Sequence, residues 1–399
     1  MNNPLRLKTR WAMHLRFVAC GAIAFMTAFA VGQQNAGRLP VQDGVALLET
    51  IDAAKKIRVF LFDSCDPGVR LDPRVADMPG GQRTNARLND GGGVIRNTMA
   101  WRVSGWKVGG HPIPDAWVVE DNLSVLRQFS GIKFTGIIGL RSLGDCVVGL
   151  DFDKLTVYVA DNKSPRFRES LPLHWVEDNP CVQVEVEGEK IEFAIATGSN
   201  GTLSLPSTLF QKLVEKKVIE LAAIDDAGSA APTGLSHERT GWFVKGLLMG
   251  RNLGGVNVDE GGEMGEIGLQ WLRAFNVELS TKHMELTYEV RQSPSEPVDW
   301  QAMLGANFEF EGTGPVVWGV RKGGGADLAG LRKGDKLASF DGIPAANLNI
   351  DNIAEHVAAK AGQNLPCELE KPGSGLITPV SIRLGRFQSQ WNSGGKTPK

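Results

Sequence analysis

Two copies of one pattern occupy the middle of the sequence, and this internal repeat constrains the fold more than any other feature. Residues 136–143 read Gly-Ile-Ile-Gly-Leu-Arg-Ser-Leu, and residues 265–272 read Gly-Glu-Ile-Gly-Leu-Gln-Trp-Leu. In both copies this motif precedes two short apolar runs, at 146–152 and 155–159 in the first and at 275–281 and 286–290 in the second. Runs of this length, rich in Val, Leu and aromatic residues, indicate β-strands.

Two further pairs of segments match upstream of this motif. Residues 106–119 and 246–258 each read as strand, glycine turn and strand, which predicts a hairpin. Residues 58–73 and 192–206 each begin with an apolar strand and continue into a turn of small and polar residues. Because the three pairs occur in one order, the sequence predicts two tandem copies of a single β-rich unit.

The repeated unit resembles the retropepsin-like aspartic peptidases, particularly the bacterial aspartyl-protease-like domains. Members of that family have an apolar strand ending in Asp-Thr/Ser-Gly, a Gly-Gly hairpin, and a strand of two hydrophobic residues and a glycine that leads into a short helix. The resemblance implies a mostly β protein with two pepsin/retropepsin-like β-barrel lobes, at residues 33–163 and 164–292. In the family the two lobes face each other and each contributes one catalytic Asp.

The catalytic motif departs from the family pattern in both copies. The first copy has Asp63-Ser64-Cys65, with cysteine in place of glycine, and the second has Ala196-Thr197-Gly198, with alanine in place of Asp. In the family one carboxylate deprotonates the attacking water while the other protonates the carbonyl oxygen, because two adjacent carboxylates share a proton. The resemblance therefore implies a catalytic Asp63 supported by Ser64, Thr197 and Gly198, and a site that lacks its second acid.

Other interpretations of this segment remain open. Asp63 alone could be a turn residue, because Asp-Ser-Cys-Asp-Pro-Gly is favourable turn chemistry. Asp66 could offer a displaced second carboxylate. A substrate-covering flap is expected before the first Gly-Gly hairpin, at about residues 87–103 with the glycines 91–93 at its tip. Trp101 or Trp106 could line the site beneath this flap or could be buried structural residues.

The C-terminal part carries the most specific motif in the chain. Residues 325–342 contain a short helix, the turn Gly-Leu-Arg-Lys-Gly-Asp and a strand that ends in Asp-Gly. This segment resembles the PDZ domains of exported bacterial proteases, which implies an α+β PDZ domain at residues 293–387. PDZ domains add a peptide to a sheet edge and bind its terminal carboxylate with backbone amides.

By this resemblance the carboxylate loop is Leu304-Gly305-Ala306, and residues 350–361 form the helix beside the groove. The apolar spacing of Ile350, Ile353, Ala354 and Val357 fits a helix with one face on the core. The alternative is a PDZ fold that packs on the second lobe without a ligand.

The two ends of the chain fall outside the predicted fold. Basic residues precede a short apolar run that ends at Ala28-Phe29-Ala30, which predicts a signal peptide at residues 1–32 and an exported protein. An uncleaved membrane anchor is the alternative, and only then would the membrane be a partner. Residues 388–399, rich in Ser, Gly, Lys and Asn, predict a disordered tail.

The composition limits the class of partner. A net charge of −2 and a pI of about 6.3 argue against nucleic acid. Cys65, Cys146, Cys181 and Cys367 have no metal-ligand spacing, and the sequence implies no cofactor and no metal. A disulfide between Cys65 and Cys146 and a set of buried free thiols are both open.

Three functions remain in contention. The first is a catalytically impaired protease-like protein that binds a polypeptide or a peptide C-terminus. The second is an active aspartic endopeptidase that uses Asp63. The third is an envelope scaffold that acts through its PDZ domain.

Overall fold

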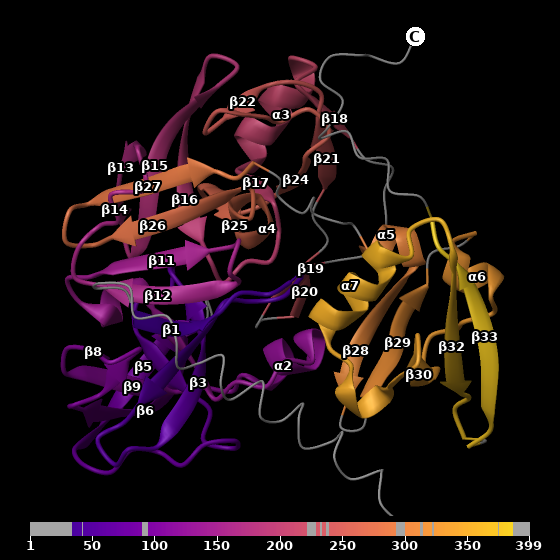
Figure 1. Ribbon diagram of the computed structural model, residues 1–399, viewed down its shortest axis with the longest axis horizontal. Helices are drawn as coiled ribbons and strands as arrows, with labels where there is room; N and C mark the ends of the chain where they lie inside the picture. Colours follow the sequence, from indigo (N-terminus) through magenta and orange to yellow (C-terminus); the bar gives the residue numbers. More distant parts are fainter. Residues whose placement is uncertain are drawn as a thin grey trace, which may run out of the picture.

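The computed structural model describes residues 34–41, 43–89, 95–221, 229–231, 234–236, 239–292, 300–311, 314–320, 323–373 and 375–385. The predicted signal peptide, the glycines at the predicted flap tip and the predicted tail at 388–399 lie outside these residues. We call residues 34–160 the first unit, 169–290 the second unit and 300–385 the C-terminal module. The chain is mostly β, as the sequence predicts (Figure 1).

The first unit contains twelve strands and two short helices among its described residues. They are β1 (Gln34–Arg38), β2 (Leu47–Ile51), β3 (Ile57–Asp63), β4 (Val69–Leu71), β5 (Arg83–Asn89), β6 (Ile95–Val103), β7 (Lys107–Val108), β8 (His111–Pro112), β9 (Ala116–Glu120), α2 (Ser124–Ser130), β10 (Gly136–Gly139), η1 (Leu140–Leu143), β11 (Val147–Asp151) and β12 (Thr156–Ala160).

The second unit follows a similar order. Its described elements are β13 (Glu169–Pro172), β14 (His174–Val176), β15 (Asn179–Val186), β16 (Glu189–Ala196), β17 (Leu203–Leu205), α3 (Ser207–Glu215), β18 (Ile219–Leu221), β19 (Ser229–Ala231), β20 (Gly234–Ser236), β21 (Thr240–Phe243), β22 (Leu247–Leu248), β23 (Arg251–Asn252), β24 (Asn257–Glu260), β25 (Gly265–Gly268), α4 (Leu269–Leu272), β26 (Phe275–Ser280) and β27 (Glu285–Val290).

The strand pairing confirms the repeat that the sequence predicts. In the first unit β3 runs parallel to β10, so that Asp63 lies opposite Gly139; in the second unit β16 runs parallel to β25, so that Ala196 lies opposite Gly268. The strand after each motif, β4 or β17, is antiparallel to that same partner strand. The predicted hairpins are also present, as β7–β8 and β22–β23.

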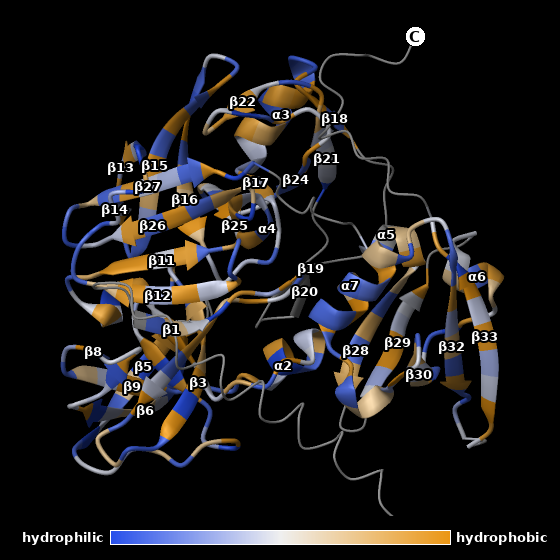
Figure 2. Cartoon of the chain, in the orientation of Figure 1, coloured by the Kyte–Doolittle hydropathy of each residue, from blue (hydrophilic) through white to orange (hydrophobic). Residues whose placement is uncertain are grey.

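One sheet joins the two units. Strand β11 of the first unit pairs with β26 of the second, giving the order β13-β27-β26-β11-β12-β1 across the junction. Figure 2 shows how apolar β11 and β12 are, as expected for strands at the centre of a sheet. The prediction of β-barrel lobes is wrong in one respect: in the described part of the chain no sheet closes into a barrel. Strand β11 of the first unit pairs with β26 of the second unit and does not close a barrel within the first unit.

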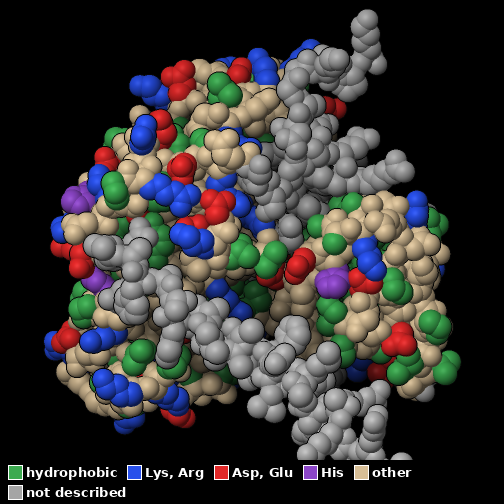
Figure 3. Space-filling model, viewed as in Figure 1, with side chains coloured by type: hydrophobic (Ala, Val, Ile, Leu, Met, Phe, Trp, Pro, Cys, Tyr) green, Lys and Arg blue, Asp and Glu red, His purple; other side chains and the backbone are tan. Residues whose placement is uncertain are grey.

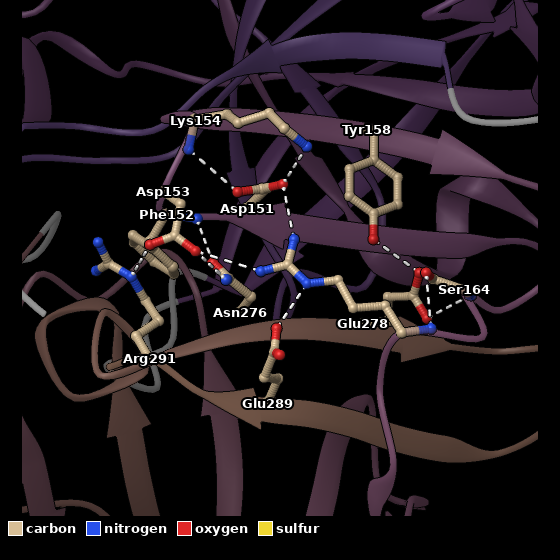
Figure 4. A network of polar contacts seen from close by, with 11 residues as sticks. Asp151, Phe152, Asp153, Lys154, Tyr158, Ser164, Asn276, Glu278, Glu289 and Arg291 are labelled. Carbon is tan, nitrogen blue, oxygen red and sulfur yellow. Dashed lines mark hydrogen bonds and ion pairs between the residues drawn. The ribbon is translucent and has the colours of Figure 1, made fainter. Parts of the chain in front are cut away.

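A buried polar contact crosses this joint (Figure 4). Tyr158 on β12 and Glu278 on β26 both pair with Gly149, which lies on the strand between them. A Cβ on Gly149 would lie 2.0 Å from Tyr158 Cζ, so the tyrosine ring lies directly over this glycine. The ring spans β11, and its hydroxyl donates to Glu278 Oε1 over 2.7 Å. The absence of a side chain at Gly149 is therefore what lets the two units bond here.

The segment between the units is fixed to the same sheet. Arg166 contacts Asp151 of the first unit at 3.5 Å and Glu289 of the second unit at 2.6 Å. The backbone N–H of Ser164 donates to both oxygens of Glu278, at 3.1 and 3.0 Å. These contacts hold the connecting segment across the joint between the units (Figure 4).

The C-terminal module has its own six-stranded sheet in the order β28-β29-β30-β32-β33, with β31 paired to β30. Its elements are α5 (Trp300–Leu304), β28 (Ala306–Glu311), β29 (Gly314–Val320), α6 (Gly325–Leu328), β30 (Lys336–Phe340), β31 (Ile343–Pro344), η2 (Ala345–Asn347), α7 (Ile350–Ala359), β32 (Asn364–Glu370) and β33 (Ile377–Arg383). The helix predicted from residue 350 is confirmed as α7, and its four predicted apolar positions are buried. Asn349 and Asn352 form a capping box at its start.

The module packs against the first unit. Leu47, Leu61 and Ile132 of the first unit share one hydrophobic cluster with Trp300, Phe308 and Ile350 of the module. That cluster contains no residue of the second unit among the described side chains, so the alternative in which the module packs on the second lobe is wrong about its partner. No helix in the described part of the chain is long and apolar enough to cross a bilayer.

We predict that Gly149→Ala destabilises the protein by roughly 2–4 kcal/mol, because the new methyl group displaces the Tyr158 ring and breaks its bond to Glu278. Urea unfolding measures the change. The control is Gly319→Ala on β29, where an added Cβ meets no atom within 4 Å and the change should stay within about 0.5 kcal/mol. Equal stabilities of the two variants would contradict this account.

Candidate functional site

The two predicted motifs meet at the interface between the units and bond to each other reciprocally. The N–H of Ser64 donates to Thr197 Oγ1 over 2.8 Å, and the N–H of Thr197 donates to Ser64 Oγ over 3.0 Å. Thr197 Oγ1 also donates to the carbonyl of Phe62 over 3.0 Å, and Ser64 Oγ donates to the carbonyl of Ile195. The structure thus brings together Ser64 and Thr197 with the pseudo-two-fold relation that the repeat implies.

Both hydroxyl side chains are completely buried. A buried donor or acceptor without a partner costs about 1–3 kcal/mol, and here each backbone N–H relies on the hydroxyl of the other unit. The hydroxyls therefore link the units directly beneath the predicted catalytic position, and the two strand ends are held in register.

Asp63 lies across this interface, against the second unit. A Cβ on Gly198 would be 2.4 Å from Asp63 Cγ, so only a glycine leaves room for the carboxylate. Gly198 N–H and Cys65 N–H both donate to that carboxylate, the latter to Oδ1 over 3.0 Å. Burial raises the pKa of Asp63 above its ordinary value, although these N–H groups and the charge of Arg70 oppose the shift.

The second carboxylate position holds Ala196, which is buried, and Cys65 is its neighbour. Cys65 is the residue of the first unit that corresponds to Gly198, so the pseudo-two-fold relation turns its side chain toward Ala196. Its Sγ lies 3.4 Å from the carbonyl oxygen of Ile195, the residue before Ala196. The Cys65 side chain therefore lies against the end of the strand that carries Ala196.

The Cys65 thiol is not an activated nucleophile. Burial, the Asp63 carboxylate and Glu266 raise the pKa of this thiol well above its ordinary value, so it stays protonated near neutral pH. The structure holds Cys65, Cys146, Cys181 and Cys367 as free thiols, so the predicted alternative of a Cys65–Cys146 disulfide is wrong.

Asp66, the other candidate acid, is held within the first unit. Its side chain is buried and accepts bonds from Gly68 N–H at 2.9 Å and from Arg70 Nε at 2.6 Å. Both oxygens are engaged within the first unit. Of the two candidate acids, Asp63 alone lies against the motif of the other unit.

The segment predicted as a flap contains a hairpin. Strands β5 and β6 form an antiparallel hairpin from Arg83 to Val103, and the glycines at its tip lie outside the described residues. Trp106 is buried against Phe60 and Arg58 and is a structural residue. Trp101 is half-buried and donates to Glu120 Oε1 over 2.9 Å. Two open hollows of about 280 and 300 Å³ flank Arg74 of the first unit, and neither includes Asp63.

The predicted carboxylate loop of the C-terminal module differs from the expectation. Leu304 and Ala306 are buried, and Gly305 has a φ of 77°, a conformation that favours glycine. The N–H of Gly305 donates to the carbonyl of Gln301 over 2.7 Å, which ends helix α5. This amide is therefore already used within the module.

No sequence pattern indicated a further group of polar residues. Asp43, Asn200, Arg273, Trp300 and Asp351 meet where the two units and the module come together. They are far apart in the sequence, and no spacing pattern connects them. No three His, Cys, Asp or Glu side chains of the described residues gather as a metal-ligand set.

No protein-family model and no curated protein matches the chain. The geometry of the site therefore has to support any functional conclusion by itself.

We predict that Thr197→Val destabilises the protein by roughly 2–4 kcal/mol, because Ser64 N–H and the Phe62 carbonyl both lose their buried partner. Thr197→Ser keeps the hydroxyl and should cost less than about 1.5 kcal/mol. Urea unfolding compares the variants. If valine and serine were equally tolerated, the reciprocal bonds would not hold the units together.

We also predict that Asp63 titrates above its ordinary pKa, whereas exposed Asp77 titrates below it because Lys56 donates to its carboxylate. The raised pKa means that the stability contribution of Asp63 is fully present below the unfolded value of about 3.9 and falls as pH rises through the folded pKa. Carbon-13 NMR of the carboxyl groups, assigned with Asp63→Asn and Asp77→Asn, measures both. An Asp63 midpoint at or below that of Asp77 would contradict the prediction.

Proposed function

We propose that the chain is an exported, retropepsin-like protein that binds an extended polypeptide across Asp63 and does not cleave it. The arrangement that carries this proposal is the pair Asp63 and Ala196, which face the same interface with one carboxylate between them. General acid and general base catalysis on a peptide bond needs two groups in opposite protonation states. A single carboxylate supplies one of them at a time.

The interface around Asp63 supports a binding role. The reciprocal hydroxyl bonds hold the two motifs against each other, so the chain itself positions the residues around Asp63. Asp63 has N–H donors on one side and a half-exposed face, and a carboxylate of this kind accepts bonds from the backbone N–H groups of a bound peptide. Figure 3 shows Lys and Arg side chains interspersed with Asp and Glu over one face of the molecule, which does not present the continuous basic surface that a polyanion would need.

The C-terminal module, with its resemblance to PDZ domains, belongs to the same proposal as a second peptide-binding part. Its sheet has an edge strand, β28, beside helix α7, which is the arrangement that accepts a peptide as an added strand. Export, by the apolar segment that ends at Ala30, would place the protein where unfolded or secreted polypeptides are its partners.

The experiment compares four proteins from pH 3 to 8: the parent, Ala196→Asp, the double variant Cys65→Gly/Ala196→Asp, and the double variant with Asp63→Ala added. The readouts are binding and cleavage of a reduced, alkylated unfolded protein. We expect the parent to bind without cleaving. We expect Ala196→Asp alone to stay inactive, because Cys65 lies against the end of the strand that would carry the new carboxylate.

Cleavage should emerge in the double variant below about pH 6, where two adjacent carboxyl groups share a proton, and should vanish when Asp63 is removed. Cleavage by the parent that Asp63→Ala abolishes would overturn the proposal in favour of an active peptidase. Failure of the parent to bind any unfolded polypeptide would leave a scaffold role for the C-terminal module.

A further inference from the structure

The edge of strand β28 is the place where the C-terminal module could accept a further strand. β28 pairs with β29 on one side, and in the described sheet it has no strand on its other side. Open sheet edges attract additional strands unless another element covers them. A peptide captured by this module would have to lie along this edge, between β28 and α7.

Helix α2 of the first unit covers that edge (Figure 1). On the outer face of the sheet, Gln128 donates to Glu309 of β28, and the ring of Phe129 meets Trp318 of β29 edge-on, with centroids 6.3 Å apart. The side chains of α2 that make these contacts are only half-buried, and none of its residues belongs to the buried core. The helix is therefore attached to the module through its surface.

The chain after α2 reaches the other face of β28. A Cβ on Gly131 would be 2.7 Å from Phe310 Cδ1 and 3.0 Å from Cα of Asn349. Phe310 lies near the end of β28 and Asn349 caps the start of α7, so Gly131 fills the space between strand and helix. With a φ of 66° and no side chain, this glycine both ends α2 and fits the groove.

Val41, Asp43 and Trp300 close the groove from a second direction. Asp351, in the first turn of α7, accepts the N–H groups of Val41 and Asp43 at 3.0 and 3.1 Å. Asp43 in turn accepts the indole N–H of Trp300 at 2.7 Å, and the Trp300 ring stacks on Phe308 in the middle of β28. Three hydrogen bonds thus attach the first unit to the module, two at α7 and one at Trp300, which stacks on β28.

The same carboxylate reaches the motif of the second unit. Asn200, two residues after Gly198, donates its side-chain amide to Asp43 Oδ1 over 3.1 Å. Burial raises the pKa of Asp43, and the nearby Asp351 charge adds to this shift while three hydrogen bonds oppose it. The Arg273 guanidinium of the second unit interacts with both carboxylates and contacts the carbonyl of Val41, so this junction joins all three parts of the molecule.

We propose that α2 and Gly131 are an internal occupant of the groove between β28 and α7, and that a peptide can add to β28 only after the first unit releases the module. Occupation of the groove by α2 would regulate peptide binding by the C-terminal module. The inference therefore rests on the proposed function. The occupant is the chain itself, and a competing ligand would be an extended peptide with an apolar C-terminal residue. An apolar residue suits the groove because Phe308 of β28 and Ile353 and Val357 of α7 belong to one hydrophobic cluster.

The test uses the double variant Phe129→Ala/Asp351→Asn, which removes one contact from each side of the groove. Both side chains are half-buried surface groups, so both folds should persist. The matched control is Glu355→Gln, which removes an exposed charge from the same helix α7. Hydrogen–deuterium exchange follows the amides of α2 and β28, and fluorescence polarisation follows a labelled decapeptide ending in Val with a free carboxylate, beside its C-terminal amide.

We expect exchange in α2 and β28 to rise at least tenfold in the double variant and to stay unchanged in the control and in β11. We expect the decapeptide to bind the double variant at least tenfold more tightly than the parent. Equal exchange in α2 and β28 of parent and double variant, or equal peptide affinity for both, would overturn the inference. Faster exchange without peptide binding to either protein would support the closed groove and remove peptide capture by the module from the proposed function.

Discussion

The reciprocal bonds between Ser64 and Thr197 are the constraint from which the rest of the structure follows. Each hydroxyl accepts the backbone N–H of the other motif. Ser64 Oγ then donates to the carbonyl of Ile195, and Thr197 Oγ1 donates to the carbonyl of Phe62. This pattern requires the two strand ends, β3 and β16, to meet at one point. Once they meet, the sheet that joins the units and the position of Asp63 against Gly198 are both determined.

That constraint does not involve the side chains at positions 63 and 196. Ala196 satisfies the same backbone bonds as an aspartate would, and it spares the fold a second buried charge. Asp63 is different: its burial disfavours the charged form, so the fold gains nothing obvious from keeping a carboxylate there. A carboxylate kept at a site where burial raises its pKa points to use in binding or chemistry.

The features that could be predicted from the sequence are those that depend on local patterns of residues. The repeat, its hairpins and helix α7 follow from period, turn residues and apolar spacing, and all were found within a few residues of their expected positions. The prediction of closed barrels was wrong because β11 pairs with β26 of the other unit. No local sequence pattern indicates which strand pairs with the edge of β11. The use of Gly305 N–H by Gln301 was hidden for a similar reason, since a glycine before a strand fits a helix end as well as a carboxylate loop.

The junction at Asp43 could not be predicted from the sequence, because its residues are far apart in the chain. It connects the two units and the C-terminal module at one carboxylate. One carboxylate joins the first unit to Trp300 of the module and to Asn200 in the motif loop of the second unit. A movement that opens the groove therefore removes the Trp300 donor from the same carboxylate that accepts from Asn200, two residues from the glycine that faces Asp63. The energy of that hydrogen bond, about 1 kcal/mol net for a neutral donor and more for a charged acceptor, sets the scale of any coupling between the two peptide-binding parts. Coupling of this size changes an affinity several-fold, which is enough for occupancy of one part to bias the other.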